Sequence, residues 1–374
     1  AGPCPGRPPR ALGGRRAEGG AAPAAPAEDE SGSLLAQSGL FLSYFGLQST
    51  MSFYMKFLLA KVRVAENLRG VPASFMITTS QQLVGFTLFL LFIGVSRLLG
   101  RPYKPKRLTS RKEVLLVLAL STSFSLNIGL NLLSLSLVPL SLTMIIRSCT
   151  PLSTALMQSL LQGKKQDISR PEWACMSVGV FCALAVVLAQ SGGPSGQASF
   201  AFFFGVAISV TSLFSGGLDF VFKSILGTSV KLNAVDTVCY MALPVAVFTS
   251  ILGAVLSKPV SASWAAVCAP RMTDLAVFTH LWQVNPAVFK FIAFSGVLAF
   301  CFNTFVTFLI VKLSPATAAF AGNFNKAATI MLSLVIFGEL APGPRGLVIL
   351  LAVLGNIVAF TTYNVIRKRR LNSK

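Results

Sequence analysis

The chain has 374 residues, of which 53% are hydrophobic and only 12% are charged, and its formal net charge is +20. A soluble domain carries roughly a quarter charged residues, so this composition excludes an ordinary soluble enzyme and predicts a helical protein with many membrane spans. The strong positive charge could indicate nucleic-acid binding. The basic residues, however, lie in short links between apolar runs, with no basic stripe interleaved with exposed aromatic residues. We therefore expect the lipid bilayer as a partner and no nucleic acid.

The sequence contains few of the residues that bind metals or carry out catalysis. The chain has seven cysteines and a single histidine, His280. The cysteines show no CxxC pairing, and most fall inside apolar runs, where cysteine behaves as a small hydrophobic residue. One histidine cannot supply a histidine metal set or a Ser-His-Asp arrangement. We predict no metal, no cofactor and no catalytic residue, and therefore a protein that is not an enzyme.

Apolar runs separated by polar breaks predict ten membrane-spanning helices, because a bilayer-spanning helix needs roughly 20 apolar residues. The expected spans are residues 39–61, 75–98, 113–137, 138–162, 172–191, 200–226, 233–256, 287–313, 316–337 and 343–365. Under this count the basic link between spans two and three lies on the same side as the basic C-terminus. This bias predicts cytosolic termini.

The segments outside the spans carry weaker predictions. Residues 1–37 begin with a stretch rich in Ala, Gly, Pro and Arg, which predicts a disordered tail, either cytosolic or left from an Arg-rich transit sequence. The link at residues 257–286 contains Trp264, Trp282 and His280. Its aromatic rings and scattered polar residues indicate either a segment that lies in the membrane interface or a plain lumenal connector. We expect the connector, with no chemical role for His280.

Spans three and four share a pattern with spans eight and nine. Asn127 and Pro139 in the first pair recur at the same mutual spacing as Asn303 and Pro315 in the second. Internal repeats of this kind are typical of secondary transporters, whose substrate site lies near the membrane midplane between the halves. The two asparagines are therefore candidate site residues. With five spans per copy, the copies must insert in opposite orientations.

We therefore predict an all-α polytopic membrane protein with ten transmembrane helices in two inverted five-helix repeats. The expected organisation is a disordered N-terminal tail (1–37), a first repeat (38–191), a linker (192–199), a second repeat (200–366) and a basic cytosolic C-terminal tail (367–374).

Each copy of the repeat carries a cation deep in an otherwise apolar span, Arg147 in the first and Lys326 in the second. An ionised side chain near the bilayer centre costs about 2.5–3.5 kcal/mol on insertion scales, so it normally faces water or an anionic partner. Spans three, four, eight and nine contain acidic residues only at their ends. Together the two cations predict an anionic guest. The planar fork of Arg147 suits phosphate oxygens, which it can bind in pairs.

Polar residues accompany both cations. Thr143 belongs to a hydroxyl-rich stretch around the arginine, while Gly322, Asn323 and Asn325 precede the lysine. The glycine would allow close approach of a helix or ligand, and the amides offer hydrogen bonds to a base or sugar. The alternatives are a structural ion pair or carbonyl cap for the arginine, and snorkelling for the lysine.

Other polar residues of the spans carry mixed predictions. Lys56 lies near the end of its span and either snorkels to the interface or gates the cavity. Asp219 and Lys223 are four residues apart and are expected to pair structurally. We expect Asp236 to cap the start of span seven, with Tyr240 one turn later available to stack on a base or sugar.

Residues 131–141, running on to Arg147 and Pro151, resemble the nucleotide-sugar and triose-phosphate translocator family of the drug/metabolite transporter superfamily. The family pattern there is valine-proline-serine followed by a lysine and a proline, and Lys56 stands in place of an asparagine-lysine pair. The resemblance covers about residues 38–367. It implies ten helices, inverted five-helix repeats and strict exchange of organic phosphates.

Subfamily motifs point in two directions. Residues 322–326 look like the motif of GDP-mannose transporters, which implies a nucleotide contact at Asn325 and a phosphate contact at Lys326. Plastid sugar-phosphate translocators carry a lysine-arginine pair where this chain has Lys326 and Ala327. The span-seven motif of GDP-sugar transporters keeps only Tyr240 here, which leaves the base open.

The predicted function is a secondary antiporter that exchanges a nucleotide sugar, with GDP-sugars among the candidates, for a nucleoside monophosphate across a Golgi or ER membrane. One alternative is a sugar-phosphate/inorganic phosphate exchanger of a plastid-type membrane. A non-transporting membrane receptor or scaffold, or a membrane enzyme, is the alternative of another class. A homodimer is a possible assembly.

Overall fold

The computed structural model describes residues 2, 30–100, 102–162, 169–191, 200–312, 332 and 343–372. The chain divides into two compact units, Ala1–Leu40 and Phe41–Lys374. In the first unit the described part is Gly2 and the opening turns of α1. Most of the predicted disordered tail and the whole 192–199 linker lie outside the described residues.

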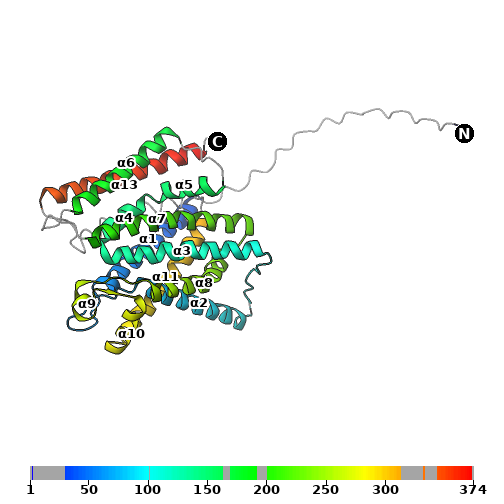
Figure 1. The fold of residues 1–374 in the computed structure, drawn as a ribbon. Coiled ribbons are helices and arrows are strands. Elements are labelled where there is room, and N and C mark those ends of the chain that lie inside the picture. The colour runs from blue at the N-terminus through cyan, green and yellow to red at the C-terminus, as the bar shows by residue number, and fades with distance from the viewer. Residues whose placement is uncertain are drawn as a thin grey trace. The chain divides into compact units, whose positions relative to one another are not determined.

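The second unit is built almost entirely from helices (Figure 1). The helices are α1 (Glu30–Ala60), α2 (Ser74–Leu98), α3 (Arg111–Leu137), α4 (Leu140–Ser148), α5 (Thr150–Gln162), α6 (Arg170–Ser191), α7 (Phe200–Ile225), the π-helix η1 (Leu226–Val230), α8 (Ala234–Val255), α9 (Ala262–Val267), α10 (Asp274–Val284), α11 (Val288–Lys312) and α13 (Pro344–Asn372). A short antiparallel ribbon pairs β1 (Lys258–Pro259) with β2 (Arg271–Met272).

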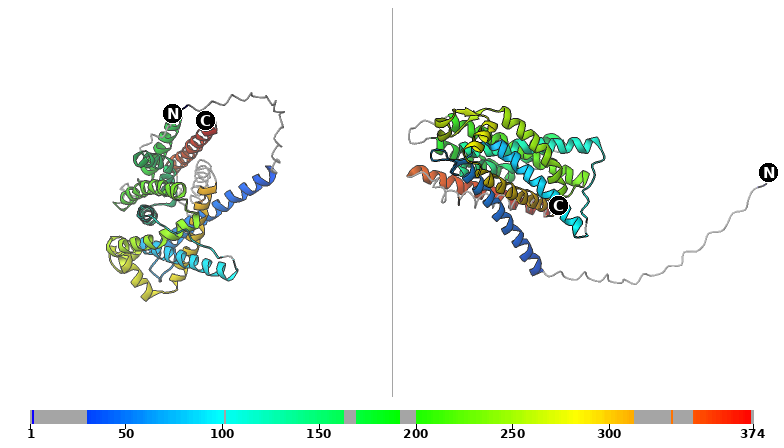
Figure 2. Two further views of the ribbon diagram at one scale, coloured as in Figure 1. Left: turned by 90° about the vertical axis from the view of Figure 1, so that its right-hand side faces the viewer. Right: turned by 90° about the horizontal axis from the view of Figure 1, so that it is seen from below.

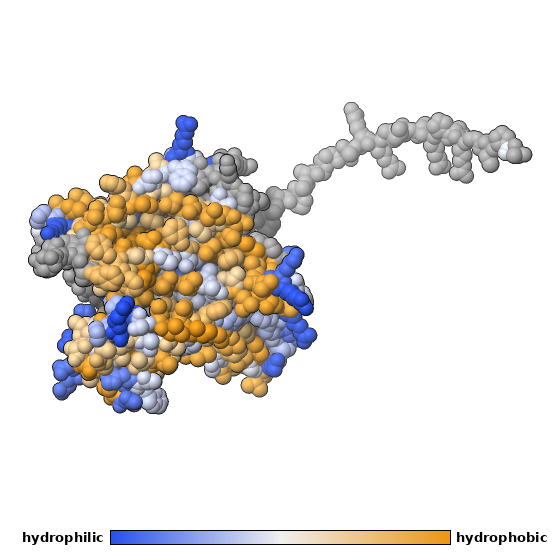
Figure 3. Space-filling view, viewed as in Figure 1, coloured by the Kyte–Doolittle hydropathy of each residue, from blue (hydrophilic) through white to orange (hydrophobic). Residues whose placement is uncertain are grey.

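The helices have the length and surface of membrane spans. In the described part of the chain, seven helices are long and apolar enough to cross a membrane, and the bent pair of α4 and α5 would add an eighth. Of the ten predicted spans, the one at residues 316–337 lies outside the described residues apart from residue 332, and the one at 138–162 corresponds to two helices. Each of the others coincides with one of the helices above. Hydrophobic side chains cover most of the helix surface in Figure 3, and hydrophilic ones gather toward the ends. The chain is thus a multi-pass membrane protein.

The prediction of one continuous helix over residues 138–162 is wrong. The two halves, α4 and α5, meet at an angle of 43° on either side of Cys149. Pro151 explains the break, because its ring would clash with the carbonyl four residues earlier, that of Arg147. The hydroxyl of Thr150 donates a hydrogen bond to this carbonyl. Arg147 therefore lies at a helix break rather than in a regular span.

Two helices extend beyond the predicted spans. Helix α1 begins at Glu30, nine residues before the predicted start of span one at residue 39. Helix α13 continues to Asn372 with Arg369 and Arg370 in its last turn, where cations are favourable. Arg370 also pairs with Glu172 at the start of α6, with 3.3 Å between Nη1 and Oε2. Much of the expected basic tail is therefore the last turn of a helix.

At one end of the bundle the α2–α3 link is fastened to the start of α8. Asp236 accepts hydrogen bonds from the Tyr103 hydroxyl at 2.8 Å and from the Lys106 backbone N–H at 3.0 Å. Burial raises the pKa of Tyr103 to about 12, so its hydroxyl stays a donor. The prediction that Asp236 caps this helix is wrong, because the N-cap is Asn233, whose side chain accepts from the Asp236 N–H. Asn233, three positions earlier, has the extended backbone of an N-cap.

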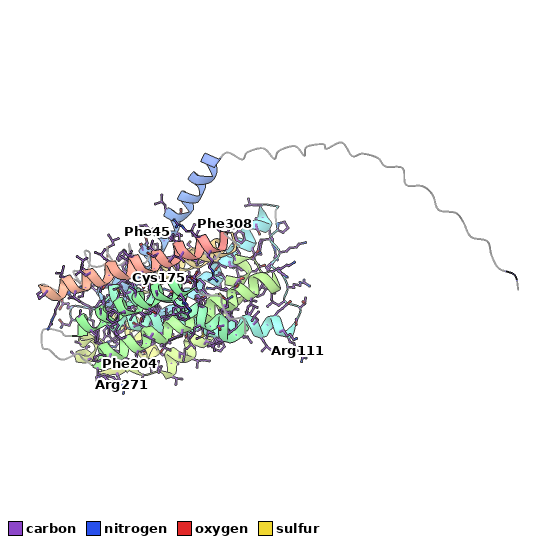
Figure 4. All side chains as sticks on the ribbon, turned by 90° about the horizontal axis from the view of Figure 1, so that it is seen from above. Phe45, Arg111, Cys175, Phe204, Arg271 and Phe308 are labelled. Carbon is purple, nitrogen blue, oxygen red and sulfur yellow. The ribbon has the colours of Figure 1, made fainter. Side chains whose placement is uncertain are left out.

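At the opposite end, residues 257–286 fold as a packed cap over the α1–α2 link. Trp264 is fully buried and its indole N–H donates to the Gly70 carbonyl at 2.9 Å. Gly70 has a φ of +74°, and a Cβ there would lie 2.3 Å from the Leu59 carbonyl oxygen, so only glycine fits. Arg111 and Arg271, labelled in Figure 4, mark the two ends, and α9 and α10 stay together in the turned views of Figure 2. This connector thus buries one of its two tryptophans in protein.

Helices far apart in the sequence pack in a regular pattern. Helix α6 lies along α13, and α2 lies along α8 (Figure 1). Helix α2 also contacts α11, while α3 contacts both α7 and α8. Along α6, Gly179 allows the closest approach, because a Cβ there would lie 2.3 Å from the Phe360 ring of α13.

Candidate functional site

Arg147 lies in the last turn of α4, partly buried, directly before the break. Its Nη2 donates a hydrogen bond of 2.8 Å to the side-chain oxygen of Asn127, which is 5% exposed on α3. The hydroxyl of Ser212 on α7 donates to the Asn127 backbone carbonyl at 2.7 Å. Two residues of the predicted site, Arg147 and Asn127, are thus in direct contact, and three helices meet at them.

Adjacent glycines of α7 make this meeting possible. A Cβ on Gly216 would lie 3.1 Å from the Asn127 side-chain oxygen, and one on Gly217 would lie 2.9 Å from the backbone of Ser153 in α5. Larger residues at either position would push α7 away from α3 or from α5. The glycine pair therefore allows α7 to approach both neighbours of the arginine.

A second charged pair lies on the same helix. Lys223 Nζ is 2.8 Å from Asp219 Oδ2, which confirms the predicted pairing. The Lys223 ammonium also stands 5.0 Å from the centre of the Phe124 ring on α3. Asp219 and Arg147 interact electrostatically, and the same arginine also interacts electrostatically with the Tyr44 hydroxyl of α1. The site thus combines an arginine with a nearby carboxylate.

Lys56 stabilises the start of the broken span. The sequence predicts snorkelling or gating for this residue, but its Nζ donates to the carbonyls of Leu135 at 3.1 Å and Val138 at 3.0 Å. These carbonyls belong to the C-terminal end of α3, where helical acceptors lose their partners and a cation is favourable. Lys56 therefore holds the turn from which α4 begins.

Helix α4 is also fixed to the second half of the chain. The Ser148 hydroxyl hydrogen-bonds to the Asn356 side-chain oxygen of α13 at 2.7 Å, and the Asn356 amide donates to the Gly179 carbonyl of α6 at 2.8 Å. Thr143, a predicted site residue, is fully buried and donates to the Pro139 carbonyl of its own helix at 3.2 Å. The turn that carries Arg147 is therefore held on α13 and α6 as well as on α3.

Other predicted site residues lie elsewhere. Tyr240 is at the end of the bundle with the α2–α3 link, where its hydroxyl donates to the Lys106 carbonyl at 2.5 Å. Asn303 is half-buried on α11, next in sequence to Phe302, whose ring stacks on Tyr44 with 6.4 Å between centroids. The remaining predicted residues, Gly322, Asn323, Asn325 and Lys326, lie outside the described residues.

Sequence reasoning missed part of the arginine's surroundings. Tyr44 and Ser212 carry no motif, and Asp219 was assigned only to its lysine partner. Two signals were nonetheless present: Pro151 inside a predicted span, and the glycine pair at residues 216–217 one turn before an intramembrane carboxylate. An arginine at a helix break, backed by an amide oxygen, can bind an oxyanion. The described residues contain no group of three His, Cys, Asp or Glu suited to a metal ion.

Apolar helices around a broken span that carries an intramembrane arginine are the architecture of a secondary transporter. The model of the UAA transporter family matches residues 47–361, and the chain belongs to this family. The family comprises transporters rather than enzymes.

Curated relatives give the same class. The chain is 26% identical to the UDP-uronic acid transporter 1 of Arabidopsis thaliana over 62% of its own length and 68% of the relative. It is 28% identical to UDP-galactose transporter 1 of the same plant, over 59% of each chain. A probable sugar phosphate/phosphate translocator of that plant is 26% identical over 61% of this chain and 67% of the relative. These matches confirm the resemblance to nucleotide-sugar and triose-phosphate translocators.

Proposed function

We propose that this protein is a secondary antiporter that carries a nucleotide sugar across a Golgi or ER membrane in exchange for a nucleoside monophosphate. The observation that carries the proposal is Arg147, held by Asn127 at the break between α4 and α5 in a chain of the UAA transporter family. Both ligands share a phosphate group, which a guanidinium binds through two parallel hydrogen bonds. Lys326, outside the described residues, is the second phosphate ligand expected from the sequence.

Exchange follows from the electrostatics of such a site. Cationic groups inside a membrane are costly without an anion, so an empty carrier should change its orientation reluctantly. A carrier loaded with either phosphate ligand meets a smaller barrier, and this difference couples the two directions of transport. The proposal includes cytosolic termini, an orientation that the positive-inside bias of the basic α2–α3 link and of the basic end of α13 supports.

The packing of the helices supports two inverted repeats. If each repeat has five spans, α2 and α8 are equivalent, and so are α6 and α13. Each of these pairs packs together, as helices on either side of a two-fold axis would. The contacts of α2 with α11 and of α3 with α8 are then equivalent to each other as well.

Two questions of substrate are open to direct test. The GDP-sugar expectation depends on residues 322–326, whereas two of the relatives carry names of UDP-sugar transporters. We therefore put UDP-sugars first and GDP-sugars second. The third relative favours a second candidate function, exchange of a sugar phosphate for inorganic phosphate.

Uptake into reconstituted vesicles separates these functions. Vesicles containing the full chain are loaded with UMP, GMP, inorganic phosphate or buffer, and then offered labelled UDP-galactose, GDP-mannose or glucose 6-phosphate. Nucleotide-sugar uptake that requires an internal nucleotide supports the proposal. Equal uptake into empty vesicles contradicts obligate exchange. Uptake of glucose 6-phosphate against internal phosphate, insensitive to nucleotides, supports the second candidate, and binding without uptake supports a receptor.

The arginine itself can be tested in the same vesicles. Arg147→Ala should reduce uptake about 10- to 100-fold, since hydrogen bonds to charged groups contribute about 1.5–3 kcal/mol. Arg147→Lys should keep part of the activity, because the charge survives while the planar fork is lost. Arg111→Ala, which removes an exposed arginine at the start of α3, is the matched control and should transport normally. A melting temperature that falls in Arg147→Ala while the ligand-induced shift stays intact would show a structural role instead.

A further inference from the structure

Only one of the two carboxylate oxygens of Asp219 accepts a hydrogen bond from the residues that the structure describes. The residue is 3% exposed on α7, and its Oδ2 accepts the ammonium of Lys223 at 2.8 Å. Its Oδ1 is buried and meets no hydrogen-bond donor among the residues that the structure describes. A buried acceptor without a donor loses the hydrogen bonds it had in water, so this oxygen is expected to meet a donor in some state of the carrier.

This oxygen of Asp219 belongs to the neighbourhood of the phosphate-binding arginine. Ser212, Gly216 and Asp219 follow one another at helical spacing on one face of α7. The first two contact Asn127, the residue that holds Arg147. Asp219 and Arg147 also act on each other electrostatically. A ligand whose phosphate reaches the arginine therefore brings its other groups close to this carboxylate.

Further buried polar atoms without partners lie along the helices that form this contact. In the described part of the chain they include the Asn131 side-chain oxygen and the Ser134 hydroxyl on α3, and the Ser209 hydroxyl on α7. The α3 residues follow Asn127 at helical spacing, and Ser209 precedes Ser212 by one turn. Native structures satisfy nearly all such groups, so several together indicate partners that come from a ligand or from water.

The charge of Asp219 decides which ligand group suits it. A carboxylate repels a phosphate, and Lys223 already supplies its cation. A neutral donor remains, and hydroxyl groups are the neutral donors that nucleotide sugars and sugar phosphates share. A ligand without the hydroxyl would leave the oxygen unpaired, and sites built to bind a hydroxyl discriminate strongly against analogues that lack it.

We propose that Asp219 is a specificity-determining residue of the transport site, whose Oδ1 accepts a hydrogen bond from a ring hydroxyl of the ligand, on the ribose or on the transported hexose, while Arg147 binds the phosphate. The inference rests on the proposed function and deepens it. It gives the site a polarity, with phosphate at the arginine and hydroxyl at the carboxylate.

If Asp219 has a purely electrostatic role, its removal should have a different effect on ligand binding. If Asp219 only offsets the charges of Arg147 and Lys223, its removal makes the site more positive. Every phosphate ligand should then bind more tightly, with or without hydroxyl groups. A hydrogen-bond acceptor instead changes the ratio between a ligand and its deoxy analogue.

The experiment measures binding to the purified full chain with two kinds of matched ligand pair, UMP against 2′,3′-dideoxy-UMP for the ribose and UDP-galactose against its deoxy-galactose analogues for the hexose. The variants are Asp219→Ala, Asp219→Asn, which keeps a weaker acceptor, and Asp219→Ala with Lys223→Met, which leaves no unpaired cation. Glu172→Gln is the control, because it alters another buried, ion-paired carboxylate. Folding is checked by the melting temperature of each ligand-free variant.

We expect the wild type to prefer the hydroxyl-bearing ligand in at least one pair, and Asp219→Ala to reduce that preference about 10-fold. Asp219→Asn should lie between them, the double variant should lose the preference equally, and the control should keep it. The pair that responds identifies the ring. Unchanged ratios in both pairs, or equal tightening for all ligands, overturn the inference and leave the proposed function standing. A folded wild type that binds none of these ligands overturns the proposed function as well.

Discussion

The buried ion pair between Lys258 and Asp274 fastens the cap at residues 257–286 to α2. The two side chains are 2% and 0% exposed, and 2.6 Å separates Nζ from Oδ1. Asp274 Oδ2 also accepts the backbone N–H groups of Phe75 at 2.6 Å and Met76 at 3.3 Å. These N–H groups open α2 and have no acceptor within the helix, so the carboxylate compensates both them and the helix dipole.

Asp274→Asn should destabilise the protein by about 3–5 kcal/mol, the usual cost of removing one partner from a buried ion pair. The substitution keeps the size of the side chain and an acceptor oxygen for α2, so most of the loss comes from the Lys258 charge left without its anion. Lys258→Met in the same chain removes that charge. The double variant should therefore recover at least half of the lost stability.

The pH dependence tests the same reasoning independently. Burial lowers the pKa of Lys258, and the Asp274 carboxylate partly offsets that effect. Asp274→Asn removes the carboxylate that partly offsets the effect of burial. The Lys258 ammonium of the folded protein therefore loses its proton at a lower pH than the same group does in the unfolded chain. Between the two values the unfolded chain binds more protons, and stability rises with pH. Thermal unfolding in detergent from pH 7 to 10 should show this rise in the single variant and a smaller one in the double variant. A double variant as unstable as the single one, or a flat pH profile for the single one, would refute the argument.

Helix contacts give two further predictions. Gly179→Ala should lower the free energy of unfolding by about 1–3 kcal/mol, because the new methyl group must displace the buried Phe360 ring. The control Gly94→Ala, which has open space around it, should be neutral or slightly stabilising, and the melting temperatures of the two variants test this difference. Lys56→Met should lower the free energy of unfolding by about 1–2 kcal/mol, because two carbonyls at the end of α3 lose their donor. Lys61→Met, at an exposed position, should change the melting temperature little, and equal effects of the two lysine variants would contradict this role of Lys56.

The membrane spans were predictable because each needs a long apolar run and polar links delimit it. The ends of α3 and α6 fall at the predicted residues, and the start of α2 lies one residue from the prediction. The break inside residues 138–162 was also marked in the sequence, by Pro151. Hydropathy alone averages over such a break, because both halves are equally apolar.

The contacts of the site were less predictable, because they join positions that no local pattern connects. Arg147 meets Asn127 across two helices, and Ser148 meets Asn356 from the other half of the chain. The apolar helices of this chain contain many serines and several asparagines, and nothing in their spacing says which pairs will meet. The role of Lys56 was missed for a related reason: its partners are backbone carbonyls, which exist at every residue and become available only where a helix ends.

The contacts at the two ends of the bundle restrict how the carrier can alternate. At one end Tyr103, in the first half of the chain, is bonded to Asp236 in the second half. At the other end Ser74 and Gly70 of the first half are bonded to Lys258 and Trp264 of the second. Rocking of the two sequence halves as separate rigid bodies would have to break both sets of bonds. A cheaper motion keeps α2, α3, α7 and α8 together and bends the remaining helices against them. The break between α4 and α5 lies among those remaining helices and carries Arg147, so we expect the proposed phosphate contact and the bending to occur at the same element.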